Sequence, residues 1–401
     1  MQDTVQIRLG EETAPELGRG TIALMAGAAG LSVASLYYNQ PMLGILAGEF
    51  AAEPASVSWV AVLTQFGYAL GLVALAPLGD RFERRGLIAL TFAGLALALF
   101  GAALAPGLGT MLAASLLVGV LATVAQQVVP MAAHLAGEAR RGSVVGTVMA
   151  GLLTGILLSR TVSGLVAAYA DWRDVYAGAA LAALAASLVL VARLPRVEPT
   201  TTLSYGRILL SLAGLFRRHA ALRRAGMVQA LLFAGFVAFW AELAFYLERP
   251  PFSQGSAMAG LLGLVGAVGV VAAPLVGRLA DRGGKGRLVT LGAGALAAGF
   301  AVMGLFPGSW IGLVAGIVLV DVGLQSALVA NQARIYGLDP AARSRINTVF
   351  MAVMFLGGGL GSALGAQAFA ALGWTGVWGL GLGCGLAALA VEVLGRGRRA
   401  A

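Results

Sequence analysis

Long apolar stretches separated by short polar connections make up almost the whole chain. A helix of roughly 20 apolar residues crosses the hydrocarbon core of a bilayer. Each stretch reaches about that length, and Pro106-Gly107 and Pro307-Gly308 lie in two of the connections. The pattern predicts an all-α membrane protein with twelve spans, at about 20–48, 57–78, 86–105, 109–136, 144–168, 173–194, 224–247, 256–278, 286–306, 309–336, 345–371 and 374–395.

The longest polar connection divides the spans into two bundles of six. We expect a tail over 1–19, an N-terminal bundle over 20–194, a linker over 195–223, a C-terminal bundle over 224–395 and a tail over 396–401. Apolar side chains in the linker share one helical face beside arginines, which is typical of a helix at the membrane surface. They are Ile208, Leu209, Leu212, Leu215 and Phe216, with Arg207, Arg217 and Arg218.

The two bundles carry matching features at a constant offset. The pairs are Asp80 and Asp281, Pro106 and Pro307, and Trp172 and Trp374, separated by 201, 201 and 202 residues. A constant offset indicates that a six-helix unit was duplicated in parallel orientation. Parallel repeats with a substrate site between them are a known transporter plan.

Composition excludes soluble classes. Hydrophobic residues make up 59% of the 401 positions and charged residues only 11%, whereas a soluble domain carries about 25% charged residues. One cysteine and two histidines argue against a disulfide framework and a histidine-based metal centre. There is no Walker loop for ATP. We expect neither enzymatic activity nor a cofactor or metal.

The basic residues indicate orientation. The net charge is +9, and 24 of the 27 lysines and arginines fall in the tails and even-numbered connections. Because cytoplasmic connections carry the excess of positive charge, we expect both termini in the cytoplasm. The arginines lie in short clusters between spans, so we expect lipid rather than nucleic acid beside them.

Two loops carry a family resemblance. The loop at 79–86 reads Gly-Asp-Arg-Phe-Glu-Arg-Arg-Gly, and its counterpart at 277–287 also holds Asp-Arg between glycines. They resemble the loop motif of the major facilitator superfamily, Gly-x-x-x-Asp-Arg-x-Gly-Arg-Arg, with Glu83 in place of one glycine. The resemblance covers essentially the whole chain and implies the fold of that superfamily.

The same loops are candidates for a cytoplasmic gate. A carboxylate at a helix end pairs with arginines or with the positive N-terminus of a neighbouring helix, and such a contact would latch the two bundles together. The alternative is that the loops only set the orientation in the membrane. The residues are Asp80, Arg81, Arg84, Arg85, Asp281 and Arg282.

Within the superfamily, the first span resembles bacterial efflux proteins of the drug:proton antiporter type, including exporters of sugars and nucleosides. Its segment 35–41 reads Ser-Leu-Tyr-Tyr-Asn-Gln-Pro. The fifth span reads Gly-Leu-Leu-Thr-Gly at 151–155 but has Ile156 where the antiporter motif has proline, and Ser115 stands where many relatives have an arginine. The resemblance implies export of a small organic compound across a bacterial inner membrane in exchange for protons, by a protein expected to act as a monomer.

Polar and aromatic residues within the spans are the candidate substrate contacts. Sparse polar groups on apolar walls describe a small-molecule site, although each glutamine alone is as well explained by a hydrogen bond between helices. The set is Tyr37, Tyr38, Asn39, Gln40, Gln65, Gln126, Gln229, Trp240 and Gln325.

We count three ionisable groups deep in the spans, namely Arg160, Glu242 and Asp321. Such groups cost about 2.5–3.5 kcal/mol each on insertion scales and therefore mark candidate functional sites. Structural pairing among the three is the alternative. We expect Arg160 to be the counter-charge and one of the two acids to carry the proton, with Glu242 slightly preferred.

Other functions are open. An uncoupled facilitator or an importer of a small organic solute would have the same fold. A channel would have a continuous polar lining or a charged ring, and a membrane sensor would need no duplicated gate loops, so both are less favoured.

Overall fold

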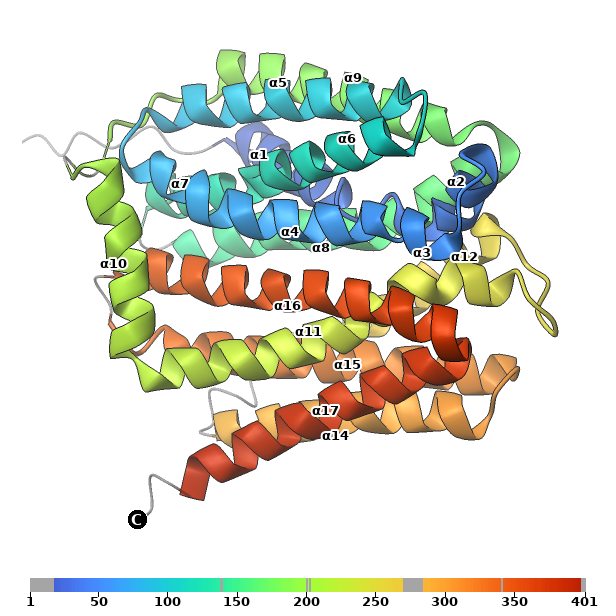
Figure 1. Ribbon diagram of the computed structural model, residues 1–401. Coiled ribbons are helices and arrows are strands. Elements are labelled where there is room, and N and C mark those ends of the chain that lie inside the picture. The colour runs from blue at the N-terminus through green and yellow to red at the C-terminus, as the bar shows by residue number, and fades with distance from the viewer. Residues whose placement is uncertain are drawn as a thin grey trace, which may run out of the picture.

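A computed structural model gives the fold (Figure 1) and describes residues 18–137, 140–199, 201, 203–269, 284–339 and 342–397. All regular elements in these ranges are helical. The first half contains α1 (Arg19–Ala34), η1 (Gln40–Met42), α2 (Leu43–Glu49), α3 (Pro54–Val57), α4 (Trp59–Ala74), η2 (Ala76–Asp80), α5 (Arg84–Ala103), α6 (Leu108–Leu121), η3 (Ala122–Val124), α7 (Ala125–Leu135), α8 (Arg141–Tyr169) and α9 (Trp172–Arg193). The rest contains α10 (Tyr205–Arg218), α11 (Ala220–Leu247), α12 (Ser256–Val265), α14 (Lys285–Leu305), α15 (Trp310–Ile335), α16 (Arg343–Leu372) and α17 (Trp374–Gly397).

The long helices lie roughly side by side in two bundles, with α1–α9 above and α11–α17 below in the view of Figure 1. Helix α10 crosses one end of both bundles. In the described ranges, ten helical segments are long and apolar enough to cross a membrane, and Arg19–Ala34 and Ser256–Gly269 are shorter apolar helices. The predicted all-α membrane fold is confirmed.

The first span differs from the single helix expected over 20–48. Helix α1 ends at Ala34, five residues follow without α-helix, and the chain resumes through η1 into α2. Pro41 has no N–H to donate and its ring clashes with the carbonyl four residues earlier, which belongs to Tyr37. The break therefore places Tyr37 to Asn39 outside regular helix and Gln40 at the start of η1, inside the bundle.

Glycines let neighbouring helices touch through their backbones, as small residues do in membrane proteins. A Cβ on Gly155 would overlap the backbone of Gly30 in α1, and a Cβ on Gly361 would overlap the backbone of Ala234 in α11. Gly155 in the fifth span and Gly361 in the eleventh therefore lie on packing surfaces between helices.

The two bundles meet along α4 with α16 and α8 with α12. Two side chains hydrogen-bond to backbone across the α8–α12 contact: Thr161 Oγ1 donates to Gly260 O at 3.0 Å, and Ser256 Oγ donates to Gly164 O at 3.2 Å. Helix α12 lies at the end of the molecule away from α10 (Figure 1). The bundles are thus joined directly at that end.

A buried ion pair within the second bundle was not expected. Arg334 of α15 donates from both terminal nitrogens to Glu392 of α17, at 3.0 and 2.8 Å, and the Glu392 side chain is fully buried. Arg224 Nε of α11 lies 3.9 Å from Glu392 Oε2. Glu392, near the end of the last span, is thus a further buried ionisable group, and it ties three helices together.

We expect Gly361→Ala to destabilise the protein. The new methyl group would force α16 away from α11, and overpacking of this kind costs about 1–3 kcal/mol. Gly383→Ala is the matched control because nothing lies within 4 Å of the position of its Cβ. The melting temperature of the protein in detergent should fall for the first variant and hold or rise for the second.

We expect Glu392→Gln to be strongly destabilising. It leaves Arg334 with an uncompensated buried charge, and removing one partner of a buried pair costs about 3–5 kcal/mol. Glu49→Gln is the control: its carboxylate lies 2.8 Å from Arg173 Nη1, but both side chains are more than a third exposed. An exposed pair contributes about 0–1 kcal/mol, so equal losses of melting temperature would contradict the prediction.

Candidate functional site

The break in the first span brings its polar residues into the interior. Tyr37, Tyr38, Asn39 and Gln40 are all buried. Asn39 Nδ2 donates to Thr64 Oγ1 of α4 at 3.0 Å. Discontinuous helices at the interface of repeats supply substrate contacts in transporters, so this segment is a candidate for that role.

Arg160 of α8 joins this segment to the other bundle. Its Nε donates to Gln40 Oε1 at 2.7 Å. Its guanidinium carbon lies 4.6 Å from the ring centroid of Tyr37 in the first bundle and 4.4 Å from that of Trp240 in α11 of the second. Phe236 of α11 adds a third ring at 5.7 Å. The structure therefore gathers four predicted site residues, Tyr37, Gln40, Arg160 and Trp240, around one buried cation.

Asp321 of α15 approaches this cation from the second bundle. Its charge interacts with Arg160, but no hydrogen bond or ion pair joins the two in the described part of the chain. Glycines of the eighth span make room for both: a Cβ on Gly263 would lie 3.1 Å from Arg160 Cβ, and one on Gly266 would lie 2.9 Å from Asp321 Oδ1. The side chains of Arg160 and Asp321 thus pack against glycines about one helical turn apart on the eighth span.

Glu242 has a different partner from the one expected. Its Oε1 accepts a hydrogen bond from Ser58 Oγ at 3.0 Å, and both residues are buried. Ser58 precedes α4 in the first bundle, so this bond crosses between the bundles near the end away from α10. Asp321 interacts electrostatically with Arg160, whereas Glu242 is bonded to Ser58.

The remaining predicted contacts are spread along the bundles. Gln126 Nε2 donates to Tyr68 Oη at 3.2 Å, and Gln229 Oε1 accepts from Asn331 Nδ2 at 3.3 Å. Gln65 is buried with both amide atoms lacking a hydrogen-bond partner, whereas Gln325 is half-buried. The structure does not bring these glutamines into direct contact with Arg160.

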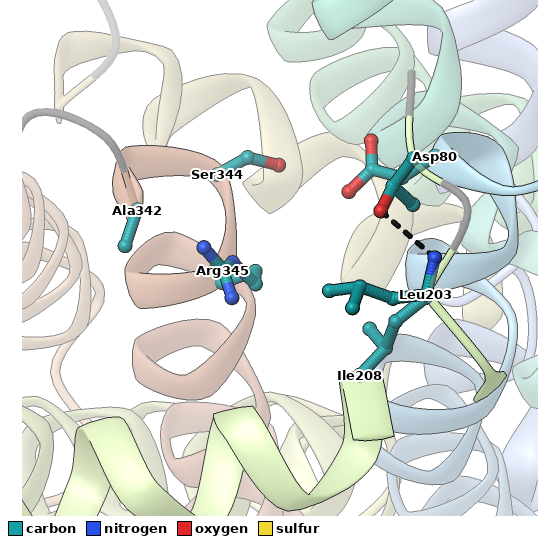
Figure 2. A pocket seen from close by; sticks show the side chains of 7 residues that line it. Asp80, Leu203, Ile208, Ala342, Ser344 and Arg345 are labelled. Atoms are coloured by element: carbon teal, nitrogen blue, oxygen red, sulfur yellow. Dashed lines mark hydrogen bonds between the residues drawn. The ribbon is translucent and has the colours of Figure 1, made fainter. Parts of the chain in front are cut away.

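A cleft of about 350 Å³ opens between the bundles at the α10 end. Figure 2 shows Asp80, Leu203 and Ile208 on one side and Ala342, Ser344 and Arg345 on the other. Helix α16 begins at Arg343, so its first backbone N–H groups, which have no partner within the helix, lie beside the cleft. Sequence reasoning missed Ser344 and Arg345, since nothing in their local pattern distinguishes them.

In the predicted gate loop, Asp80 is paired with Arg84, while Arg85 and Arg81 have other contacts. Arg84 Nη2 lies 3.2 Å from Asp80 Oδ1, and Arg84 Nε donates to Gly79 O at 2.9 Å. Arg85 Nη1 donates to Leu194 O at 3.4 Å, and the Arg81 guanidinium lies over the ring of Phe82. Asp281 and Arg282 lie outside the described residues.

Glu83, which departs from the motif, has a local role. Its carboxylate accepts hydrogen bonds from the backbone N–H groups of Arg85 and Gly86, at 2.9 and 2.8 Å. It therefore caps the N-terminus of α5, where side-chain acceptors satisfy donors that have no helical partner.

Comparison with known proteins supplies the family. The model of the Major Facilitator Superfamily matches residues 25–332. The chain is 39% identical to the uncharacterized transporter YgaY of Escherichia coli O157:H7 over 362 residues, which cover 90% of this chain and 92% of that one. It is 34% identical to the probable transporter SCO4007 of Streptomyces coelicolor over 367 residues, covering 89% and 83%.

Solved structures share the fold. The nucleoside transporter NupG matches with a TM-score of 0.73 at 14% identity, over 92% of this chain and 99% of that one. A bacterial homologue of the human lysosomal transporter Spinster, in an inward-facing and occupied conformation, matches with a TM-score of 0.69 at 14% identity, over 94% of each chain. The chain belongs to the Major Facilitator Superfamily and is a membrane transporter rather than an enzyme.

Proposed function

We propose that this transporter exports a small organic compound by alternating access, in exchange for protons, from the cytoplasm across the bacterial inner membrane. Drug-like molecules, sugars and nucleosides are the first compounds to consider. The fold is shared with the nucleoside transporter NupG. We place both termini and the 195–223 linker in the cytoplasm on the distribution of arginines. A single chain contains both bundles, so a monomer suffices.

One observation carries the proposal. Arg160 contacts residues of both bundles, and Asp321 lies near it without a direct bond. Charges buried within the membrane are costly and mark substrate and proton pathways. Because Arg160 contacts residues of both bundles, its contacts change when one bundle rocks against the other. Alternating access requires this motion.

The two ends of the molecule support the same cycle. Hydrogen bonds between the bundles close the end away from α10, through Thr161, Ser256 and the pair Ser58–Glu242. The cleft beside Asp80 and Arg345 lies at the other end. With α10 in the cytoplasm, this arrangement corresponds to an inward-facing state.

In this cycle the cytoplasmic gate is the contact between the Asp80 loop and α16. When the cleft closes, the Asp80 carboxylate approaches the N-terminus of α16 and the Arg345 guanidinium. A carboxylate at a helix N-terminus is stabilised by the helix dipole. We therefore infer a latch that holds the outward-facing state.

We assign the coupling proton to Asp321 and keep Glu242 as the second candidate. A proton on Asp321 cancels the charge that faces Arg160 and so changes the electrostatic environment of the whole site. Glu242 is bonded to Ser58 across the bundles, so its protonation would act on closure of the outer end. An uncoupled facilitator or importer is the alternative function; a channel or sensor is less favoured.

We expect Asp321→Asn to abolish transport driven by a pH gradient while substrate exchange without a gradient continues at saturating substrate. Proteoliposomes with an imposed gradient would first be screened with drugs, sugars, nucleosides and amino acids. Glu242→Gln should retain driven transport, at a lower rate because the bond to Ser58 is weakened. If both variants still accumulate substrate against its gradient, the protein is not a proton antiporter that uses these acids.

We expect Asp80→Asn to slow transport while expression stays normal. Loss of the charge removes about 1 kcal/mol of stabilisation at the helix N-terminus, which lowers the population of the latched state by roughly fivefold. Glu198→Gln removes an exposed carboxylate of the linker and is the matched control. Full activity of the Asp80 variant in the exchange assay would contradict the latch and indicate that the loop only sets the orientation of the chain in the membrane.

A further inference from the structure

Three hydrogen-bond donors with no acceptor belong to Arg160 and to two side chains that contact it. They are Arg160 Nη2, Gln40 Nε2 and Trp240 Nε1, and each is buried. Their residues are 4%, 1% and 2% exposed. An unsatisfied buried polar atom is costly, and in a native structure it calls for an explanation. Three such donors around one cation match an oxyanion, because carboxylates accept charge-assisted hydrogen bonds from arginine.

Asp321 presents the opposite deficit. Its Oδ2 is buried with no hydrogen-bond partner, and the residue is 8% exposed. The carboxylate interacts electrostatically with Arg160 but does not bond to it. This acceptor is suited to a cationic donor, such as a protonated amine.

A ligand with one charge satisfies only half of this site. An anion at Arg160 leaves Asp321 without a donor, and a cation at Asp321 leaves the three donors around Arg160 without an acceptor. We propose that the transported solute is amphoteric: its carboxylate binds Arg160, Gln40 and Trp240, and its protonated amine binds Asp321. This inference names the solute class of the proposed transport site and therefore rests on the proposed function.

The surroundings describe the body of the solute. Tyr37, Phe236 and Trp240 surround the guanidinium with aromatic rings. Apolar walls with a few convergent polar groups fit a small molecule that has an apolar part. The class is therefore that of amino-acid-like solutes with an apolar side chain. Protonated Asp321 has no charge for the amine, so proton and solute exclude each other at this residue, as exchange requires.

The test is a binding experiment with matched probes. The full-length protein in detergent would be titrated calorimetrically with L-phenylalanine, phenylpropionate and phenethylamine, which share one ring but carry both charges, only the anion or only the cation. L-leucine, isocaproate and isoamylamine form a second set. In at least one set, we expect the amino acid to bind about tenfold more tightly than either analogue, as each lost charge contact costs roughly 1.4 kcal/mol.

Variants assign each charge to its residue. Arg160→Gln should remove the preference for the amino acid over the amine, and Asp321→Asn should remove its preference over the acid. Arg160→Lys keeps the charge and should keep part of the preference. Arg249→Gln is the matched control. The guanidinium carbon of Arg249 also lies 4.6 Å from a ring centroid, that of Phe369, but Arg249 is exposed. Melting temperatures show which variants are folded.

Equal or tighter binding of a singly charged analogue in both sets would overturn the proposal, and so would absence of binding by all six probes. Binding is measured without a pH gradient, so its outcome is separate from that of the exchange assay. Amphoteric preference without proton-driven transport would refute the antiport mechanism and leave the solute class standing. If only a singly charged solute is transported in response to the pH gradient, the amphoteric solute class is refuted and the antiport mechanism stands.

Discussion

A cation buried between the two bundles is the constraint on which the rest of the site depends. An arginine in the membrane interior is tolerated only where neighbouring groups replace its hydration. Here Gln40 accepts from the guanidinium, rings from both bundles lie against it, and Asp321 supplies the opposite charge. These groups come from the break in the first span, from α11 and from α15, so the arrangement of the helices and the position of the charge determine each other.

The break in the first span and the glycines of the eighth span both serve this arrangement. A continuous first helix would carry its polar side chains around the whole helix, whereas the break brings both Tyr37 and Gln40 into contact with Arg160. Side chains at Gly263 and Gly266 would collide with Arg160 and Asp321. The helix break and the two glycines are thus found beside the buried charges of Arg160 and Asp321.

Two kinds of polar contact have different roles in this molecule. Glu392 is bonded on both oxygens to Arg334 within one bundle, so it holds helices that move together. Contacts between the bundles, such as Ser58 with Glu242 and Thr161 with Gly260, are single hydrogen bonds. A net contribution of about 0.5–1.5 kcal/mol for each such bond lets the bundles separate during a transport cycle.

The sequence by itself determined the all-α membrane fold, the family and the identity of Arg160, Asp321, Tyr37, Gln40 and Trp240 as residues to examine. Hydropathy and buried charge reveal this much because apolar length and ionisable groups in a bilayer are decided by solvation, residue by residue. Partners are decided by packing between helices far apart in the chain. Only the tertiary structure therefore placed Glu242 on Ser58 rather than beside Arg160, and joined Glu392 to Arg334 near the end of a span, where the pattern showed only an apolar helix.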